Sequence, residues 1–151
     1  MKRKAEKEKV LFICTHNSAR SQMAEGFLRS LYSDRFDAYS AGTQPSGLNP
    51  YAVQVMAEIG IDISSHRSKS VDEFFNTEID YVITVCDHAK QICPFFPGGK
   101  ESLHKGFEDP GAFSGSEDEK VAIFRRVRDE IREWINETFG EDGNKRPIKS
   151  K

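Results

Sequence analysis

Apolar and polar stretches alternate along the chain in a way that predicts strands and helices in turn. Residues 10–14, VLFIC, form a continuous apolar run rich in β-forming side chains, which is typical of a strand buried on both faces of a parallel sheet. A helix is expected directly after it, with Ser18 as a suitable N-cap. Its apolar positions recur at helical intervals, at Met23, Phe27, Leu28 and Leu31. The pattern predicts a strand that ends at Cys14, a tight loop and a helix.

The same alternation continues in the middle of the chain. Residues 38–40 predict a short strand, and after a turn rich in Gly and Pro, residues 52–59 predict a helix that Gly60 ends. Residues 80–86, DYVITVC, predict another strand buried on both faces. This strand ends at Cys86, so two predicted strands finish at a cysteine.

The last part of the chain predicts two more helices. The polar residues 87–93 predict a short helix before Pro94, and a brief strand is expected near residues 104–107. Residues 121–139 predict a long amphipathic helix. Its apolar face is formed by Val121, Phe124, Val127, Ile131, Trp134 and Ile135. Strands that alternate with helices predict the α/β class with a parallel sheet.

Length and the distribution of apolar residues predict one folded unit. A chain of 151 residues is long enough to bury a single core. Residues 140–151 lack the apolar side chains that packing needs, so we expect this tail to be disordered. Residues 1–8 are expected to be a flexible N-terminal segment, which leaves residues 9–139 as the domain that carries any catalytic activity.

The charge balance argues against two classes of partner. The formal net charge is −2, so no overall basic field would follow a nucleic-acid backbone or an anionic membrane. No apolar stretch predicts a transmembrane helix or a signal peptide, so we expect a cytoplasmic protein, and we expect a monomer. In a reducing cytoplasm, three cysteines are better explained as catalytic, redox-active or buried thiols than as a disulfide framework.

The segment CTHNSARS lies where parallel α/β sheets bind ligands, at the carboxyl end of a strand and the start of a helix. Its backbone amides can converge on a tetrahedral anion, and Arg20 can add a bidentate guanidinium. The same groups would stabilise a nucleophilic Cys14 thiolate beneath the anion. A buried cysteine or a helical arginine is unremarkable alone, but their combination with Ser21 is specific. The candidate substrate-binding residues are Thr15, His16, Asn17, Ser18, Ala19, Arg20 and Ser21.

This segment, together with MAEGF at 23–27 and SAGT at 40–43, resembles the low-molecular-weight protein tyrosine phosphatase fold family, whose anion loop has the pattern CxxxxxR[ST]. The resemblance covers roughly residues 9–139. Within the family it is closest to the thioredoxin-coupled arsenate reductases because of the other two cysteines. It implies a single-domain, three-layer α/β sandwich with a four-stranded parallel sheet.

The spacing of Cys86 and Cys93 would couple their redox state to local structure. On a helix the two residues lie about 10.5 Å apart along the axis. A disulfide needs Cα atoms within roughly 7 Å, so joining them requires residues 87–92 to unwind. Because Cys86 ends a predicted strand, we expect it beside Cys14 at the edge of the sheet. Two core thiols are the alternative; the spacing does not match common zinc ligands, so no metal site is expected.

The resemblance assigns roles to these side chains. The reductases contain a nucleophilic, an intermediate and a resolving cysteine in the order that Cys14, Cys86 and Cys93 match. Both branches of the family use an aspartate before a proline as general acid, a position that Asp109 matches. Judged from the residues alone, Asp109–Pro110 is equally consistent with a plain turn.

Some of the resembling reductases hold a potassium ion beside the loop. The ligands match Asn17, Glu25 and Ser40, but Lys69 stands where an acidic residue is expected. Its ammonium could take the place of the cation, although Lys69 could also be an exposed loop lysine. We expect that potassium is not required, that no cofactor is bound and that thioredoxin supplies the reducing equivalents. Loop or surface positions rather than catalytic roles are expected for the four histidines, His16, His66, His88 and His104.

The combined pattern predicts reduction of arsenate to arsenite through a Cys14 adduct and a disulfide relay that involves Cys86 and Cys93. A tyrosine phosphatase with the same nucleophile, arginine and aspartate is the first alternative. It is disfavoured because Gly111 and Ala112 follow the Asp–Pro pair, where such phosphatases usually carry aromatic residues. A non-catalytic oxyanion or redox sensor is the second alternative.

Overall fold

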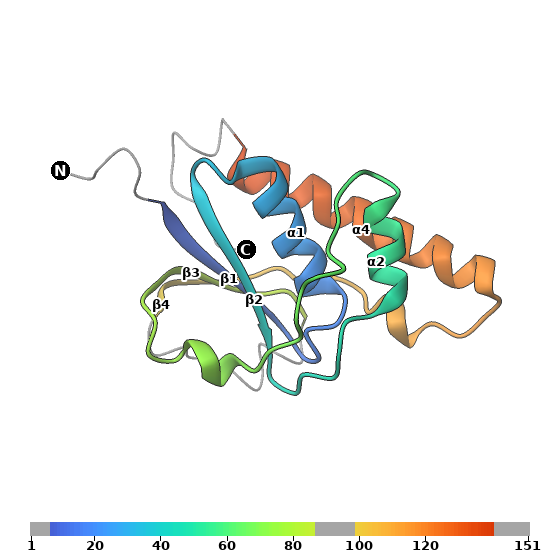
Figure 1. Cartoon of the computed structure of the whole chain (residues 1–151), viewed down its shortest axis with the longest axis horizontal. Coiled ribbons are helices and arrows are strands. Elements are labelled where there is room, and N and C mark those ends of the chain that lie inside the picture. Colours follow the sequence, from blue (N-terminus) through green and yellow to red (C-terminus); the bar gives the residue numbers. More distant parts are fainter. Residues whose placement is uncertain (1–6, 87–98, 141–151) are drawn as a thin grey trace.

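A parallel four-stranded sheet forms the centre of the molecule, with the strand order β2-β1-β3-β4 (Figure 1). The computed structural model describes residues 7–86 and 99–140. The strands are β1 (Glu8–Cys14), β2 (Phe36–Gly42), β3 (Ile79–Thr84) and β4 (Gly99–His104). The helices are α1 (Arg20–Tyr32), α2 (Pro50–Ala57) and α4 (Glu117–Phe139), with 3-10 turns η1 (Val71–Phe74) and η2 (Pro110–Ala112). The predicted α/β class with a four-stranded parallel sheet is confirmed.

Strand β1 is buried because both faces of the sheet are covered. On one face, Phe12 packs edge-on against Trp134 of α4, with ring centroids 6.1 Å apart. On the other face, Tyr39 contacts Phe74 of η1 at a centroid distance of 5.7 Å. Helices α1, α2 and α4 pack against one another on one side of the sheet, as Figure 1 shows. A continuous apolar run therefore marks the central strand of a parallel sheet.

The start of α1 differs from the prediction. Helix α1 begins at Arg20, and its N-cap residue Ala19 makes no side-chain capping hydrogen bond. Ser18 is not the cap; its carbonyl accepts a hydrogen bond from Asn49 N at 2.9 Å. A capping serine would occupy an N–H group of the first turn. Without such a cap, these N–H groups stay available to a ligand.

The prediction of a strand near residues 104–107 is wrong, because β4 spans Gly99–His104. Most of its side chains are at least partly exposed, as befits a strand at the edge of the sheet, and its sequence GKESLH lacks the apolar run that marks a buried strand. The predicted strand 80–86 is β3, which ends at Thr84, so Cys86 lies just beyond it.

The predicted helices 52–59 and 121–139 exist but begin earlier. Asn49 caps α2 with its side chain, and Pro50 occupies the first helical position. Ser116 and Glu119 form a reciprocal capping box at the start of α4. The predicted strand 38–40 is likewise the middle of the longer β2.

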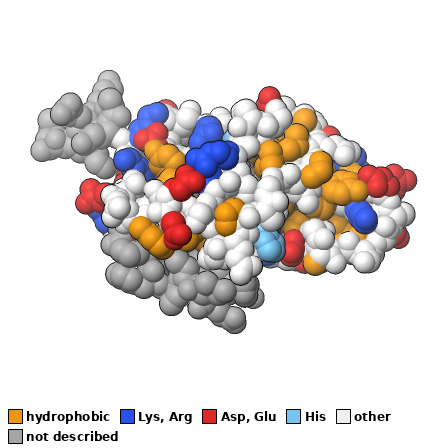
Figure 2. Space-filling model, turned by 60° about the horizontal axis from the view of Figure 1, so that its bottom comes forward, with side chains coloured by type: hydrophobic (Ala, Val, Ile, Leu, Met, Phe, Trp, Pro, Cys, Tyr) orange, Lys and Arg blue, Asp and Glu red, His pale blue; other side chains and the backbone are white. Residues whose placement is uncertain are grey.

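Three predictions fall mostly on residues outside those described: the flexible segment 1–8, the short helix at 87–93 with Cys93, and the tail 140–151. Of the first segment, Glu8 is described and already belongs to β1. In the part that is described, no helix has the length and apolar character to cross a membrane. Figure 2 shows one face of the molecule, on which acidic and basic side chains are interspersed. This face carries no extended basic tract of the kind that follows a nucleic-acid backbone.

Candidate active site

The loop between β1 and α1 is held from outside through its carbonyl groups. Four loop carbonyls accept hydrogen bonds from backbone N–H groups of residues 43–49. The bonds are Thr43 N to Cys14 O at 3.2 Å, Gln44 N to Thr15 O at 2.7 Å, Ser46 N to His16 O at 3.1 Å and Asn49 N to Ser18 O at 2.9 Å. Gly42 allows this close approach, because a Cβ atom there would lie 2.7 Å from Thr15 O and 2.9 Å from Asn17 N. The glycine of SAGT is therefore required by the neighbouring backbone.

Asn17 reverses the direction of the loop. Its φ of 51° makes it the one non-glycine residue with a positive φ in the described chain. Asn17 Nδ2 donates to Ser21 Oγ at 2.8 Å and to Ser40 Oγ at 3.0 Å. Asn17 Oδ1 accepts from Gln22 Nε2 at 3.0 Å and from Lys69 N at 2.8 Å. These bonds hold a conformation that asparagine tolerates better than most residues.

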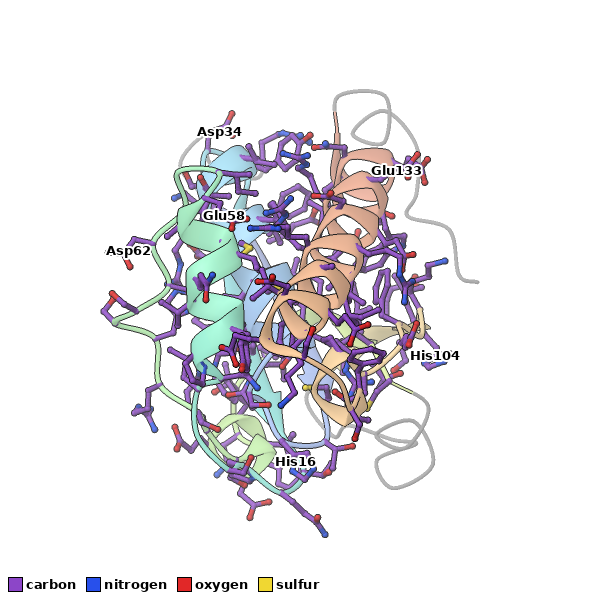
Figure 3. All side chains as sticks on the ribbon, turned by 90° about the vertical axis from the view of Figure 1, so that its right-hand side faces the viewer. His16, Asp34, Glu58, Asp62, His104 and Glu133 are labelled. Carbon is purple, nitrogen blue, oxygen red and sulfur yellow. The ribbon has the colours of Figure 1, made fainter. Side chains whose placement is uncertain are left out.

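The backbone donors of the loop are left for a ligand. Among the described residues, the N–H groups from His16 to Ser21 have no hydrogen-bond acceptor. They lie at the N-terminus of α1, where the helix dipole adds a partial positive charge. Figure 3 labels His16 at the opposite end of the molecule from Asp34, which places the loop at the carboxyl end of the sheet. Such a concave group of amides is suited to a tetrahedral oxyanion.

Cys14 lies at the base of this loop and is 2% exposed. Its Sγ is 2.9 Å from Ser21 Oγ. Because Ser21 Oγ already accepts a hydrogen bond from Asn17 Nδ2, its own hydrogen is available to the sulfur. The Ser21 hydroxyl and the N-terminus of α1 both lie next to the sulfur that the sequence predicts as the nucleophile.

Arg20 and Asp109 meet at the mouth of the loop. Arg20 Nη1 donates to Phe107 O at 3.1 Å, and Arg20 Nη2 lies 3.6 Å from Asp109 Oδ2. Asp109 Oδ1 accepts from Gly111 N at 2.9 Å, which orients the carboxylate at the start of η2. Glu108 points away and pairs with Arg126 of α4. The structure therefore brings the candidate acid beside the candidate anion-binding arginine.

The second thiol reaches the same pocket. Cys86 Sγ lies 3.3 Å from Thr15 Oγ1, and both side chains are buried. The pocket has a volume of about 480 Å³. Its walls are formed by Thr15, His16, Arg20, Gln44, Cys86, Phe107 and Asp109. Cys93 lies outside the described residues, so the geometry joins Cys86 alone to the loop of Cys14.

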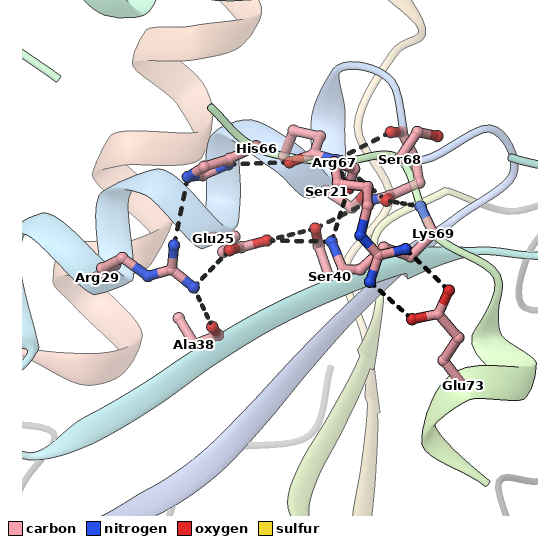
Figure 4. A network of polar contacts seen from close by, with 12 residues as sticks. Ser21, Glu25, Arg29, Ala38, Ser40, His66, Arg67, Ser68, Lys69 and Glu73 are labelled. Atoms are coloured by element: carbon pink, nitrogen blue, oxygen red, sulfur yellow. Dashed lines mark hydrogen bonds and ion pairs between the residues drawn. The ribbon is translucent and has the colours of Figure 1, made fainter. Parts of the chain in front are cut away.

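A charged cluster lies behind the loop (Figure 4). Buried Glu25 accepts from Ser40 Oγ at 2.5 Å and pairs with Arg29 Nη2 at 2.6 Å. Lys69 Nζ lies 4.0 Å from Glu25 Oε1 and donates to Arg67 O at 2.8 Å. Burial lowers the pKa of Lys69, and the Glu25 carboxylate opposes that shift. With 12% of its side chain exposed, Lys69 is a partly buried member of the cluster rather than an exposed loop lysine.

Three pocket or support residues were absent from the sequence-based site. Phe107 and Gln44 line the pocket, and Gln22 is fully buried next to Asn17. Gln22 is flanked by Ser21 and Met23, so only its complete burial, and not its local sequence, indicates a hydrogen-bonding role. Phe107 and Gln44 stand in connecting segments with no local pattern. Over the described ranges, no three His, Cys, Asp or Glu side chains are grouped to hold a metal ion.

Comparison with known proteins identifies the family. The family described as low molecular weight phosphotyrosine protein phosphatase matches residues 9–145. The chain belongs to this family. The low molecular weight phosphatase fold expected from CTHNSARS is therefore confirmed, together with its four-stranded sheet.

Within the low molecular weight phosphatase family, the chain is similar to proteins named arsenate reductase. It is 49% identical over 137 residues to one from Halalkalibacterium halodurans, covering 91% of this chain and 98% of that protein. It is 45% identical over 138 residues to one from Bacillus subtilis, covering 91% and 99%. A solved structure of an arsenate reductase in the phosphate binding state superposes with a TM-score of 0.72 at 32% identity, covering 86% of this chain and 95% of the other.

Proposed function

We propose that this protein reduces arsenate to arsenite, with Cys14 as the nucleophile. The observation that carries the proposal is the buried Cys86 thiol, 3.3 Å from Thr15 Oγ1 in the wall of the oxyanion pocket. A phosphatase needs one thiol at this place. Reduction of an oxyanion needs a second thiol, because the two electrons come from oxidation of two thiols to a disulfide. The similarity to arsenate reductases over nearly their whole length supports the same assignment.

The first half of the reaction uses the loop, Arg20 and Asp109. The amides and the guanidinium bind the anion, and the Cys14 thiolate attacks arsenic. One arsenic–oxygen bond breaks, and Asp109 acts as the general acid that donates a proton to the departing oxygen. Cys86 then attacks Cys14 Sγ. The electron pair of the sulfur–arsenic bond stays on arsenic, which leaves as arsenite, and a Cys14–Cys86 disulfide remains.

The second half restores the thiols. Cys93 attacks Cys86, which frees the Cys14 thiolate and moves the disulfide to Cys86–Cys93. Thioredoxin then reduces this disulfide by the same exchange chemistry and becomes oxidised itself. The spacing of the two cysteines and the family resemblance support this step. We propose a cytoplasmic location, because the relay depends on a reducing compartment. We also propose that the protein acts as a monomer.

No bound cofactor is required by this scheme, and we propose that Lys69 takes the role of a bound cation. Its ammonium lies 4.0 Å from the Glu25 carboxylate, in the cluster that Asn17 and Ser40 complete. Activity and stability are therefore expected to be insensitive to potassium. Turnover and melting temperature measured in matched potassium and sodium buffers test this point, and clear stimulation by potassium would contradict it.

Arsenite release in the presence of thioredoxin, thioredoxin reductase and NADPH tests the function. The unchanged protein is expected to turn over repeatedly. Cys86→Ser should stop after the Cys14 adduct, and Cys93→Ser should release one equivalent of arsenite. The two variants are matched controls, because each removes one sulfur atom from a different step. Multiple turnovers by Cys93→Ser with thioredoxin would overturn the relay, and a sensor would release no arsenite at all.

One observation favours phosphatase activity as a second candidate. The sequence places no aromatic residue directly after Asp109–Pro110, but Phe107, just before this pair, lines the pocket. Its ring and the volume of about 480 Å³ leave room for an aryl phosphate. Hydrolysis of p-nitrophenyl phosphate by the Cys86→Ser variant tests this activity without redox turnover. Phe107→Ala is expected to raise KM for this substrate.

A further inference from the structure

A buried glutamine connects the anion loop to a distant segment of the chain. Gln22 Nε2 lies within hydrogen-bonding distance of three oxygen atoms: Asn17 O at 3.1 Å, Asn17 Oδ1 at 3.0 Å and Arg67 O at 3.0 Å. Because Asn17 Oδ1 and both carbonyls accept, this end of the Gln22 side chain is the NH₂ group. The other end, Oε1, is then an acceptor whose orientation is known.

The orientation of Gln22 determines the state of His66. Gln22 Oε1 is 3.0 Å from His66 Nδ1, so Nδ1 carries a proton and donates. On the opposite side of the ring, His66 Nε2 lies 3.4 Å from Nη1 of Arg29, which can only donate. Nε2 therefore offers its lone pair. The two neighbours together select a neutral imidazole with its proton on Nδ1. Figure 4 shows the contact between His66 and Arg29.

The charges around His66 agree with a neutral ring. Burial lowers its pKa, and the positive charges of Arg29 and Lys69 lower it further. The carboxylates of Glu25 and Asp62 oppose these effects, but the balance stays below the ordinary value. These groups come from α1 and from the loop that contains His66. A proton added at Nε2 would face the guanidinium of Arg29 directly.

The peptide group between Asn17 and Ser18 links this network to the anion. It carries the Asn17 carbonyl, which Gln22 holds, and the Ser18 N–H, which has no acceptor in the described protein. Because a peptide group is planar and trans, fixing its carbonyl also fixes the direction of its N–H. Gln22 therefore controls where a donor of the anion loop points.

We propose that Gln22 and His66 are positioning residues that hold the Asn17–Ser18 peptide with its N–H directed at the bound oxyanion. His66 acts through Gln22, whose amide it keeps in one orientation. A second contact reinforces the same segment, since Ser68 Oγ donates to His16 O at 3.0 Å. The inference rests on the proposed function only in requiring that the loop bind an oxyanion.

Binding of sulfate measured by calorimetry tests the proposal, because the charge of sulfate is constant near neutral pH. His66→Asn keeps an amide nitrogen near the Nδ1 position and should bind sulfate within about twofold of the unchanged protein. His66→Leu removes the donor, and loss of one buried hydrogen bond predicts about tenfold weaker binding. Gln22→Glu places a carboxylate oxygen against Asn17 O and should weaken binding at least as much.

A control separates positioning from general loss of stability. Glu58→Gln weakens the ion pairs that link α2 to α4, far along the chain from the loop. It should lower the melting temperature and leave the sulfate affinity unchanged. Sulfate binding by His66→Leu equal to that of the unchanged protein would overturn the proposal, and so would an equal loss of affinity in Glu58→Gln.

Nitrogen NMR of His66 in the free protein gives an independent test. At neutral pH we expect a protonated Nδ1 and an unprotonated Nε2. A proton on Nε2 would overturn the proposed positioning role of His66, whatever the sulfate affinity. Failure of the unchanged protein to bind sulfate would count against the proposed function. The position of the His66 proton would still decide whether His66 orients Gln22.

Discussion

The anion loop and the seam between α2 and α4 use charged and polar groups in opposite ways. In the seam, buried Arg128 donates to Val55 O at 3.0 Å and to Glu58 Oε1 at 2.9 Å, and Glu58 also pairs with Arg125 at 2.7 Å. In the loop, the carbonyls are bonded but the N–H groups from His16 to Ser21 have no acceptor in the described chain.

The contrast shows how one chain separates stability from chemistry. The charged groups in the seam are paired with one another, so they serve to join two helices. Unpaired donors in the loop cost stability, but they are already oriented when an anion arrives. The cost is tolerated because the rear of the loop is fully bonded through Asn17 and its neighbours.

The largest expected effect is that of Cys14→Ser. Removing the proposed nucleophile should lower arsenate reduction by more than about a thousandfold, while the fold and the amide groups remain. Single-turnover arsenite release and circular dichroism measure the two properties. Substantial residual reduction would place the chemistry outside the loop and break the contrast between the two regions.

Arg20→Lys should have the next largest effect. It keeps the positive charge but loses the planar pair of donors, so kcat/KM for arsenate should fall by about a hundredfold. Arg125→Lys in the seam is the matched control and should leave kcat/KM unchanged. Equal losses in the two variants would show that the loop is not specialised.

Arg128→Leu tests the seam between α2 and α4, where the expected effect is on stability rather than on turnover. It leaves Val55 O without its donor and removes one partner of Glu58. The free energy of unfolding should fall by about 2 kcal/mol, with kcat/KM little changed. Urea denaturation and steady-state kinetics test the pair of expectations; a large loss of turnover in a stable variant would contradict them.

The smallest effect is a dependence of stability on pH. The pKa of His66 is lowered by burial, so the unfolded chain takes up the proton first as pH falls. This contribution to stability is complete above about pH 6.5, the ordinary value, and is lost as pH falls towards the folded pKa. Urea denaturation at a series of pH values should show the loss. In His66→Asn it should be absent, since the carboxylates with lowered pKa values, such as Glu58, titrate at lower pH.

Local patterns identified most of the fold because they act over a few residues. The apolar run before Cys14 has to be buried on both faces, and the helical spacing of apolar positions predicts the core faces of α1 and α4. The polar edge strand β4 was misplaced, since its position depends on pairing with β3 rather than on its own composition. Ser18 was expected to cap a helix whose first N–H groups are instead left open.

The sequence by itself determined that Cys14 and Arg20 share one loop, because a strand, five residues and a helix start bring them together locally. Only the tertiary structure decided that Asp109 lies beside Arg20, that Cys86 contacts Thr15, and which proton His66 carries. Each of these contacts joins residues far apart along the chain. Their geometry depends on how the strands are ordered and how the connecting segments pack, which short-range patterns do not encode.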